Sequence, residues 1–266
     1  MMNYTERNHT FVLCAYKESP YLEECIRSLK SQKRKSQILV ATSTPNDYIA
    51  DIASKYGLSV QINTGEKGIA GDWNFAYGLA ETALVTLAHQ DDVYEYEYTE
   101  KILEAINRCN NPLIAFTDYY ELRNGRTVKK NKLLLVKRML LFPLRWKRLW
   151  KSRFTRRRIL SLGSAICCPA VTMVKTALPN PLFKNNMKSN IDWQAWEELS
   201  KLEGEFAYVA EGLMKHRIHE ESTTSELLEN NKRKEEDLFM YYKFWPRAMA
   251  RFIEHFYQSG EKSNKK

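Results

Sequence analysis

Short apolar segments alternate with helix-like segments through the first half of the chain, and this alternation restricts the possible folds more than any other feature. The apolar runs with the length and composition of buried strands lie at residues 10–15, 37–41, 59–62, 84–88 and 113–117. Strands that alternate with helices build a largely parallel sheet with ligand-binding groups at the carboxyl ends of its strands. We therefore predict an α/β fold with a Rossmann-like, mostly parallel central sheet flanked by helices.

The remaining elements and the domain organisation follow from the same patterns. Helices are predicted at residues 21–32, 48–56, 72–81 and 98–108, where apolar residues recur at helical spacing. A further strand is expected at 166–175, and a helix should contain Asp192, Trp193 and Trp196. The two tryptophans share one helical face, so we expect them to pack in the core rather than to stack on a ligand. The expected units are one domain at 1–225, a basic insertion within it at 129–158, and a helical C-terminal extension at 226–266.

The positive charge of the chain is concentrated in the basic insertion. The net charge is +9, and residues 129–158 hold thirteen Lys or Arg with no Asp or Glu. The apolar residues that share a helical spacing there are Phe142, Trp146, Leu149, Trp150 and Phe154. Such a segment either lies on an anionic membrane surface or packs its apolar stripe on the domain. We do not expect nucleic acid as a partner, because no recognised nucleic-acid motif accompanies the segment.

Two absences indicate the compartment. The first ten residues lack the apolar core of a secretory signal, and no run of eighteen uncharged apolar residues occurs. The five cysteines form an odd set without zinc spacing, which favours reduced thiols. These features predict a cytoplasmic protein, with peripheral attachment to the inner face of the cell membrane as an option.

Two adjacent carboxylates, Asp91 and Asp92, directly follow the apolar run at 84–88. A cation relieves their mutual repulsion, and hard oxygen ligands suit Mg²⁺ or Mn²⁺, which also engage substrate phosphates. The alternative is an acidic N-cap on the next helix. Asp192 is suited to cap the helix that contains Trp193, and a lone histidine such as His219 is most often a surface or packing residue.

Ordered motifs over residues 10–225 resemble the family-2 glycosyltransferases. FVLCAYKES (residues 11–19) is similar to the opening strand of that family and its Tyr-Asn-Glu turn, and YLEECIRSLKSQ matches the first helix. GIAGDWNFAYGLA (residues 68–80) resembles the loop and helix before the metal motif, and LAHQDDVY (residues 87–94) resembles the Asp-x-Asp-Asp region. NIDWQAW (residues 190–196) looks like the motif that supplies the catalytic base. HRIHEES (residues 216–222) is similar to a C-terminal motif whose histidine completes the metal shell.

The resemblance implies a GT-A fold and an inverting, metal-dependent glycosyltransferase of the bacterial cell-surface polysaccharide type. It implies Asp192 as the catalytic base, and Asp91, Asp92 and His219 as ligands of Mn²⁺ or Mg²⁺. The implied contacts to the donor nucleotide are Ala15, Tyr16, Glu18, Ser43, Gly71, Asp72, Asn74, Gln90 and Asp91. The expected partners are a nucleotide-sugar donor, first of all a UDP-sugar, and a glycan or lipid-linked acceptor.

This chain departs from the family pattern at two positions of the donor site. Thr42-Ser43-Thr44 stands where the family often has an Asp pair that reads the base, and His89 replaces the first Asp of the metal motif. Two other functions therefore stay open: a nucleotidyltransferase with the same metal chemistry, and a catalytically inactive protein that binds membranes. The first is disfavoured because residues 15–20 contain no glycine with which to cradle a triphosphate.

Overall fold

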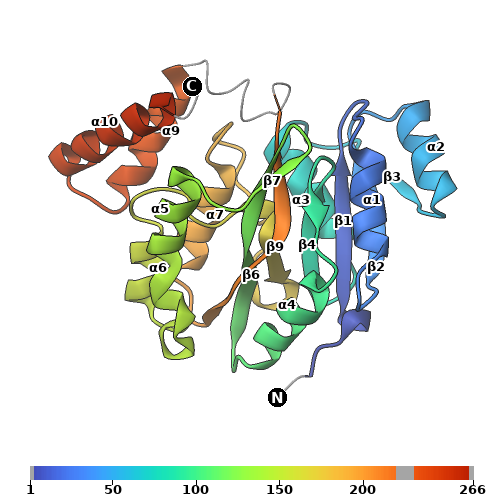
Figure 1. Cartoon of the computed structure of the whole chain (residues 1–266), viewed down its shortest axis with the longest axis horizontal. Helices are drawn as coiled ribbons and strands as arrows, with labels where there is room; N and C mark the ends of the chain where they lie inside the picture. Colours follow the sequence, from blue (N-terminus) through green and yellow to red (C-terminus); the bar gives the residue numbers. More distant parts are fainter. Residues whose placement is uncertain (1–2, 220–230, 264–266) are drawn as a thin grey trace.

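The computed structural model describes residues 3–219 and 231–263, and a nine-stranded sheet runs through this part of the chain (Figure 1). The strand order is β3-β2-β1-β4-β8-β6-β9-β5, with β7 paired to β6. Helices flank the sheet, as the sequence predicted, and the α/β class is confirmed.

The first half of the sheet is parallel. Its strands are β1 (His9–Ala15), β2 (Gln37–Thr42), β3 (Val60–Ile62) and β4 (Leu84–His89). The helices of this half are α1 (Leu22–Lys30), α2 (Asp47–Lys55) and α3 (Ile69–Leu79), and α4 (Tyr98–Asn107) follows. Each overlaps a segment predicted from periodicity. The reason is local, since the apolar residues that recur along α1 (Leu22, Cys25, Ile26 and Leu29) are all buried against the sheet.

The second half of the sheet is mixed. Its strands are β5 (Val93–Tyr94), β6 (Pro112–Arg123), β7 (Arg126–Val128), β8 (Val171–Val174) and β9 (Glu205–Ile218). Strand β8 runs antiparallel between β4 and β6, whereas β9 is parallel to β6 and antiparallel to β5. The predicted strand at 166–175 is shorter in the structure, because the short helix η4 (Cys168–Ala170), which contains Pro169, precedes β8.

Strand β9 was not expected from the sequence. Its middle contains Glu211 and Gly212, and its register with β6 shifts at Thr117 and Asp118. A side chain at Gly212 would place its Cβ 2.4 Å from the Tyr120 ring, so this ring lies directly over the glycine where the two strands cross. The irregularity hides the alternation that marks a strand, and long-range pairing decides the element instead.

The prediction that the apolar residues of the basic insertion form one helical stripe is wrong. The segment is divided into α5 (Lys132–Leu141), η2 (Phe142–Arg145), η3 (Lys147–Leu149) and α6 (Arg153–Ile159). Trp150 is buried and donates its indole N–H to the Leu144 carbonyl at 2.6 Å, whereas Phe154 is 71% exposed. Pro143 interrupts the α-helical hydrogen bonding at the start of η2, so residues with helical spacing no longer share a face.

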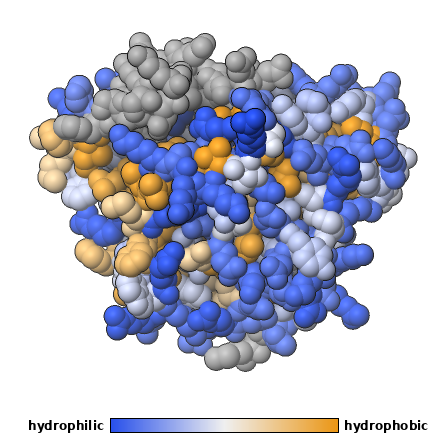
Figure 2. Space-filling model, in the orientation of Figure 1, coloured by the Kyte–Doolittle hydropathy of each residue, from blue (hydrophilic) through white to orange (hydrophobic). Residues whose placement is uncertain are grey.

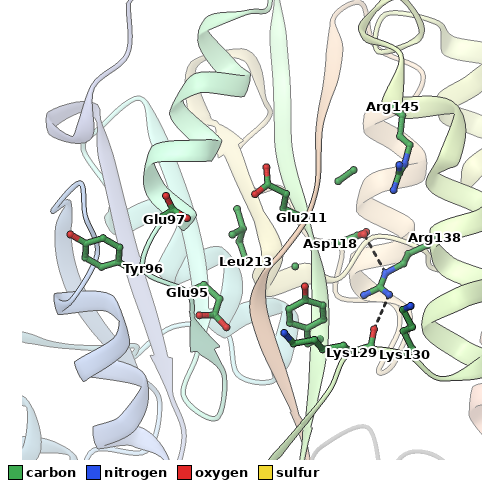
Figure 3. A pocket seen from close by; sticks show the side chains of 13 residues that line it. Glu95, Tyr96, Glu97, Asp118, Lys129, Lys130, Arg138, Arg145, Glu211 and Leu213 are labelled. Carbon is green, nitrogen blue, oxygen red and sulfur yellow. Dashed lines mark hydrogen bonds and ion pairs between the residues drawn. The ribbon is translucent and has the colours of Figure 1, made fainter.

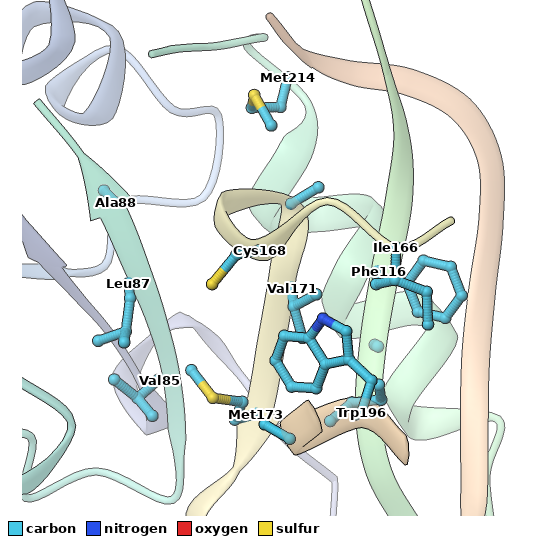
Figure 4. Close-up of a cluster of buried hydrophobic side chains, with 14 of the residues drawn as sticks. Val85, Leu87, Ala88, Phe116, Ile166, Cys168, Val171, Met173, Trp196 and Met214 are labelled. Atoms are coloured by element: carbon cyan, nitrogen blue, oxygen red, sulfur yellow. The ribbon is translucent and has the colours of Figure 1, made fainter. Parts of the chain in front are cut away.

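Helix α7 (Ile191–Leu199) is held by its tryptophans, which confirms their predicted place in the core. Trp193 donates its indole N–H to the Leu160 carbonyl at 2.9 Å, and both side chains are almost completely buried. Trp196 lies in the apolar cluster between the sheet and α7, beside Val171 and Phe116 (Figure 4). This packing fixes the start of α7, where Asp192 is located.

The C-terminal extension is helical, as predicted, and consists of α9 (Asn231–Tyr242) and α10 (Arg247–Ser263). The predicted boundary between residues 225 and 226 lies outside the described residues. A buried carboxylate, Glu197, connects this extension to the domain, with ion pairs to Arg157 and Lys201 at 2.7 Å and to Lys243 at 3.3 Å. Burial alone would raise the pKa of Glu197, but these cations outweigh it and lower the pKa.

We expect Glu197→Ala to lower the free energy of unfolding by about 2 to 3 kcal/mol, somewhat less than for a fully buried pair, because its three cations stay partly exposed. The control is Glu198→Ala, which removes the carboxylate next in sequence, bound to the exposed Lys184. Urea unfolding measures both. Equal destabilisation by the two substitutions would contradict this role for Glu197.

Candidate functional site

The acidic pair lies at the carboxyl end of β4, in the turn to β5. Helix α4 begins only at Tyr98, with Glu97 as its N-cap, so neither Asp91 nor Asp92 caps a helix. This excludes the alternative that the sequence had left open. The two carboxylates meet different partners, and both sets of partners come from the distant end of β9.

Asp91 is paired with His219. The distance from Asp91 Oδ2 to His219 Nε2 is 3.0 Å, between residues 128 positions apart in the sequence. Burial alone would raise the pKa of Asp91, but the hydrogen bond from His219 and the charge of His216 outweigh burial and lower the pKa. The carboxylate is therefore held ionised, next to an imidazole nitrogen.

Asp92 is completely buried and serves the backbone of β9. Its Oδ1 accepts the Arg217 backbone N–H at 3.0 Å and lies 3.0 Å from His216 Nδ1, while its Oδ2 has no hydrogen-bond partner within the described part of the chain. Burial lowers the pKa of His216, but the charge of Asp92 and the hydrogen bond to it dominate and raise the pKa. Asp92 thus positions the end of β9, which His219 directly follows.

Arg217 closes this corner of the site. Its Nε donates to the Asp91 carbonyl at 2.8 Å, its Nη2 donates to Glu24 Oε2 at 2.5 Å, and its guanidinium lies 4.1 Å from the centre of the Tyr21 ring. Sequence reasoning missed both Arg217 and His216. The available signal was the sequence HRIH, which places two histidines and an arginine at the end of one segment, but without the pairing of β9 this segment is indistinguishable from a surface turn.

Asp192 is the second residue of α7, and Asn190 is the N-cap. Its Oδ1 accepts the Trp193 backbone N–H at 2.7 Å, so it also supports the first turn of the helix. Burial raises the pKa of Asp192 from its ordinary value, although this N–H and the charge of Lys137 act in the opposite direction. A partly buried carboxylate with a raised pKa is suited to accept a proton.

The two halves of the candidate site share one neighbourhood. The charges of Lys137, Asp92 and Asp192 all act on the half-buried Cys167 thiol, whose pKa is raised mainly by desolvation. Lys137 Nζ lies 5.3 Å from the centre of the Tyr119 ring, and this ring meets His216 edge-on at 6.2 Å. Lys137 of the basic insertion therefore acts on the acidic residues of the site, which the sequence did not suggest.

The predicted nucleotide-binding residues lie along the carboxyl edge of the parallel strands. Gln90 accepts the Tyr16 backbone N–H at 2.9 Å and donates to the Tyr16 carbonyl at 2.8 Å, which joins the ends of β1 and β4. Ala15 is the last residue of β1, and Glu18 is exposed beyond it. Lys17, between Tyr16 and Glu18, has a φ of 53°, and Thr44 accepts its N–H at 2.6 Å.

A second group of predicted residues joins β2, β3 and α3. Asp72 accepts hydrogen bonds from Ser43 Oγ at 2.9 Å and from Asn63 Nδ2 at 2.8 Å. Gly71 lies so close to the Glu66 carbonyl that a Cβ would be 2.3 Å from its oxygen. The carboxylate of Asp72 therefore lies beside the serine that replaces the acidic residue of the family pattern.

Asn74 acts differently from the other predicted residues. Its Oδ1 accepts the backbone N–H groups of Leu182 and Phe183 at 3.0 and 2.8 Å, and its Nδ2 donates to the Phe183 carbonyl at 2.7 Å. The side chain thus binds the segment before α7 to α3. In this structure Asn74 therefore supports the site by holding the backbone at Leu182 and Phe183.

The large cavity of about 660 Å³ does not coincide with this site (Figure 3). Glu97 and Glu211 lie on one side of it, and Lys130, Arg138 and Arg145 lie on the other. It is lined by Tyr120, whereas the neighbouring Tyr119 points toward His216. Because side chains alternate along a strand, cavity and candidate site lie on opposite faces of β6.

Within residues 3–219 and 231–263, no three His, Cys, Asp or Glu side chains gather closely enough to hold a metal ion by themselves. Of the three predicted ligands, Asp91 and His219 are adjacent, whereas Asp92 is committed to His216 and Arg217. Asp92 Oδ2 has no hydrogen-bond partner within the described residues, so the role of Asp92 as a ligand stays a prediction.

Comparison with known proteins gives a family and a fold. The family model described as glycosyl transferase family 2 matches residues 10–178, and no curated protein matches the chain. Residues 1–349 of S. aureus TarS in complex with UDP-GlcNAc superpose with a TM-score of 0.64 at 17% identity, covering 93% of this chain and 70% of that chain. The mannosyltransferase PcManGT from Pyrobaculum calidifontis, in complex with GDP-Man and Mn²⁺, gives 0.63 at 15% identity, covering 95% and 70%. At these identities the likeness establishes the fold, and the GT-A prediction is confirmed.

Proposed function

Because this chain belongs to glycosyl transferase family 2, we propose that it moves a sugar from a nucleotide-diphosphate sugar to a hydroxyl group of a glycan or lipid-linked acceptor. We further propose inversion at the anomeric carbon and a role in the synthesis of a cell-surface polysaccharide. The observation that carries the proposal is the pairing of Asp91 with His219 at 3.0 Å, between residues 128 positions apart in the sequence.

The proposed donor site lies at the carboxyl ends of β1 and β2, among the predicted contacts Ala15, Tyr16, Glu18, Ser43, Gly71, Asp72, Asn74, Gln90 and Asp91. Asp72 would read the base in place of the missing acidic residue, because it lies 2.9 Å from Ser43 Oγ and each of its oxygens can accept a further hydrogen bond. We propose a UDP-sugar as donor. Two proteins of similar fold hold UDP-GlcNAc and GDP-Man, which supports a nucleotide sugar as the ligand class.

Asp91 and His219 fit a divalent cation. Two ligand atoms 3.0 Å apart match adjacent positions around one ion, given metal–ligand distances of about 2.0 to 2.2 Å. When bound, Mn²⁺ or Mg²⁺ supplies positive charge that stabilises the diphosphate leaving group. Asp92 supports the site by holding His216 and the Arg217 backbone, and donor phosphates and water would complete the shell.

Asp192 is the proposed general base. The acceptor hydroxyl gives its proton to the Asp192 carboxylate while its oxygen forms a bond to the anomeric carbon. The bond from that carbon to the diphosphate breaks on the opposite side, so the configuration inverts and a nucleoside diphosphate leaves. The raised pKa of Asp192 makes it a stronger base than a solvated carboxylate.

Incubation with a panel of nucleotide sugars and Mn²⁺ should release nucleoside diphosphate and no pyrophosphate. EDTA should abolish the release, and excess Mn²⁺ or Mg²⁺ should restore it. Pyrophosphate as the product would instead identify a nucleotidyltransferase. Rates equal to those of Asp192→Asn with every donor, in the presence of acceptor extracts, would favour the inactive binding protein.

We propose that the protein works in the cytoplasm at the inner face of the cell membrane. Within residues 3–219 and 231–263, no helix combines the length and apolar character needed to cross a bilayer. Attachment would therefore depend on surface residues, and the exposed part of the basic insertion supports it.

A further inference from the structure

Helix α5 exposes apolar side chains on its outer side. Leu135 and Met139 are 49% and 74% exposed, and Val136 is similarly open, whereas Leu134 and Leu141 are buried. A helix on the surface of a globular domain normally carries polar residues on the side opposite the core. An apolar outer side indicates that something else covers it.

The apolar surface continues past the end of α5. Phe142 and Trp146 are each about half exposed, and their rings meet edge-on at 5.1 Å. Phe142 is the C-cap of α5 and keeps a helical backbone, so it continues the side that Leu135 and Met139 share before Pro143 ends the helix. Figure 2 shows apolar side chains on the left of the molecule, where Figure 1 places α5 and α6.

Exposed cations surround this surface. Lys132, Lys147 and Arg148 are exposed, and the Arg145 guanidinium lies 5.7 Å from the centre of the Phe142 ring. No acidic residue occurs within 129–158. Other cations of the insertion have structural partners, since Arg156 is buried against Phe206 and donates to the Leu202 carbonyl at 2.8 Å. The structure thus separates the cations that fold the insertion from those that face solvent.

We propose that this basic–apolar face (Leu135, Val136, Met139, Phe142 and Trp146 with Lys132, Arg145, Lys147 and Arg148) binds the surface of an anionic lipid bilayer. Aromatic and aliphatic side chains enter the interface, while Lys and Arg extend toward the lipid phosphates. The inference deepens the proposed function, since it names the partner and the residues of the membrane attachment.

A second copy of the chain fits this face less well than lipid does. A two-fold contact would place the same cations opposite each other, without acidic residues from the insertion to neutralise them. A bilayer that contains anionic lipid provides both the apolar layer and the negative charge. The face is also connected to the candidate site, because Lys137 on the inner side of α5 reaches Tyr119.

Vesicle cosedimentation tests the proposal with two variants of the full chain. Lys147→Gln with Arg148→Gln should weaken binding to phosphatidylcholine vesicles containing phosphatidylglycerol by about thirtyfold, since each cation near such a surface contributes about fivefold. Met139→Ser with Trp146→Ser should weaken it by at least about tenfold. The matched control is Lys30→Gln with Lys35→Gln, which removes the same charge from exposed positions at the end of α1 and in the connection to β2, and should have little effect.

The outcomes separate this proposal from the enzymatic one. Asp192→Asn should bind vesicles like the wild type, and the two face variants should keep wild-type donor hydrolysis in solution. Equal binding to pure phosphatidylcholine, or equal loss from the Lys30 and Lys35 control, overturns the proposal. The proposal is also overturned if the wild type binds no vesicles and instead forms a dimer that dissociates when Met139 and Trp146 are replaced.

Discussion

Asp192→Asn will remove most of the sugar transfer and leave the protein folded. In the wild type, Asp192 Oδ1 accepts the Trp193 backbone N–H at 2.7 Å. Asparagine retains an oxygen that can accept this N–H, so the first turn of α7 is preserved. It cannot take a proton from an acceptor hydroxyl. General base catalysis typically contributes about 10²- to 10⁴-fold, and we expect kcat to fall by that range with little change in donor KM.

The raised pKa of Asp192 gives this prediction a pH dependence. Catalysis needs the ionised carboxylate, so kcat/KM of the wild type should decline on acidification at a higher pH than an aspartate of ordinary pKa would give. Between the unfolded and the folded pKa, the folded state binds more protons, and stability falls as the pH rises through this window. Asp192→Asn should therefore be at least as stable as the wild type at neutral pH in urea unfolding.

A matched control is Asp47→Asn, because Asp47 also lies in the first turn of a helix but is exposed on α2. It should transfer sugar at the wild-type rate. If Asp192→Asn keeps wild-type kcat, or loses activity only because it unfolds, Asp192 is a structural residue of α7 and not the base.

Asp91→Asn should have the second large effect, a loss of metal-dependent activity. The substitution removes the anionic partner of His219, 3.0 Å away, and with it a proposed ligand of the cation. Metal stabilisation of the leaving group is worth several kcal/mol, so kcat/KM should fall by about 10²- to 10³-fold. The Mn²⁺ concentration for half-maximal donor hydrolysis should also rise.

His219→Ala should resemble Asp91→Asn, and the double variant should lose little beyond either single one, because both act through the same ion. The control is Asp51→Asn, an exposed carboxylate on α2. Additive losses from Asp91→Asn and His219→Ala, or an unchanged Mn²⁺ dependence in both, would show that the pair does not bind the metal.

The parallel half of the fold could be predicted because its signals are local. In α1 the apolar residues recur at helical spacing and in β1 they form one continuous run, and these residues are buried. The second half was harder. Strand β9 has an irregular middle around Gly212, and its existence depends on pairing with β6 and β5, which no window of sequence contains.

The candidate site shows the same division. Motif order was enough to select Asp91, Asp92, Asp192 and His219, since residue type and position after a strand suggest carboxylate and imidazole chemistry. Their separate roles were not predictable. Asp92 turned out to hold His216 and the Arg217 backbone, and Lys137 enters from an insertion that the motifs do not include.

The sequence by itself determined the α/β class, the positions of the parallel strands along the chain and the types of residue available for chemistry. Each of these depends on periodicity or composition within a short stretch. Only the tertiary structure decided which residues of the same type are buried in the fold and which are exposed to solvent. Arg156 and Arg148 belong to the same basic insertion, yet one is buried against Phe206 and the other is exposed. Burial and pairing are set by partners far away in the chain, and these partners meet only when the sheet is complete.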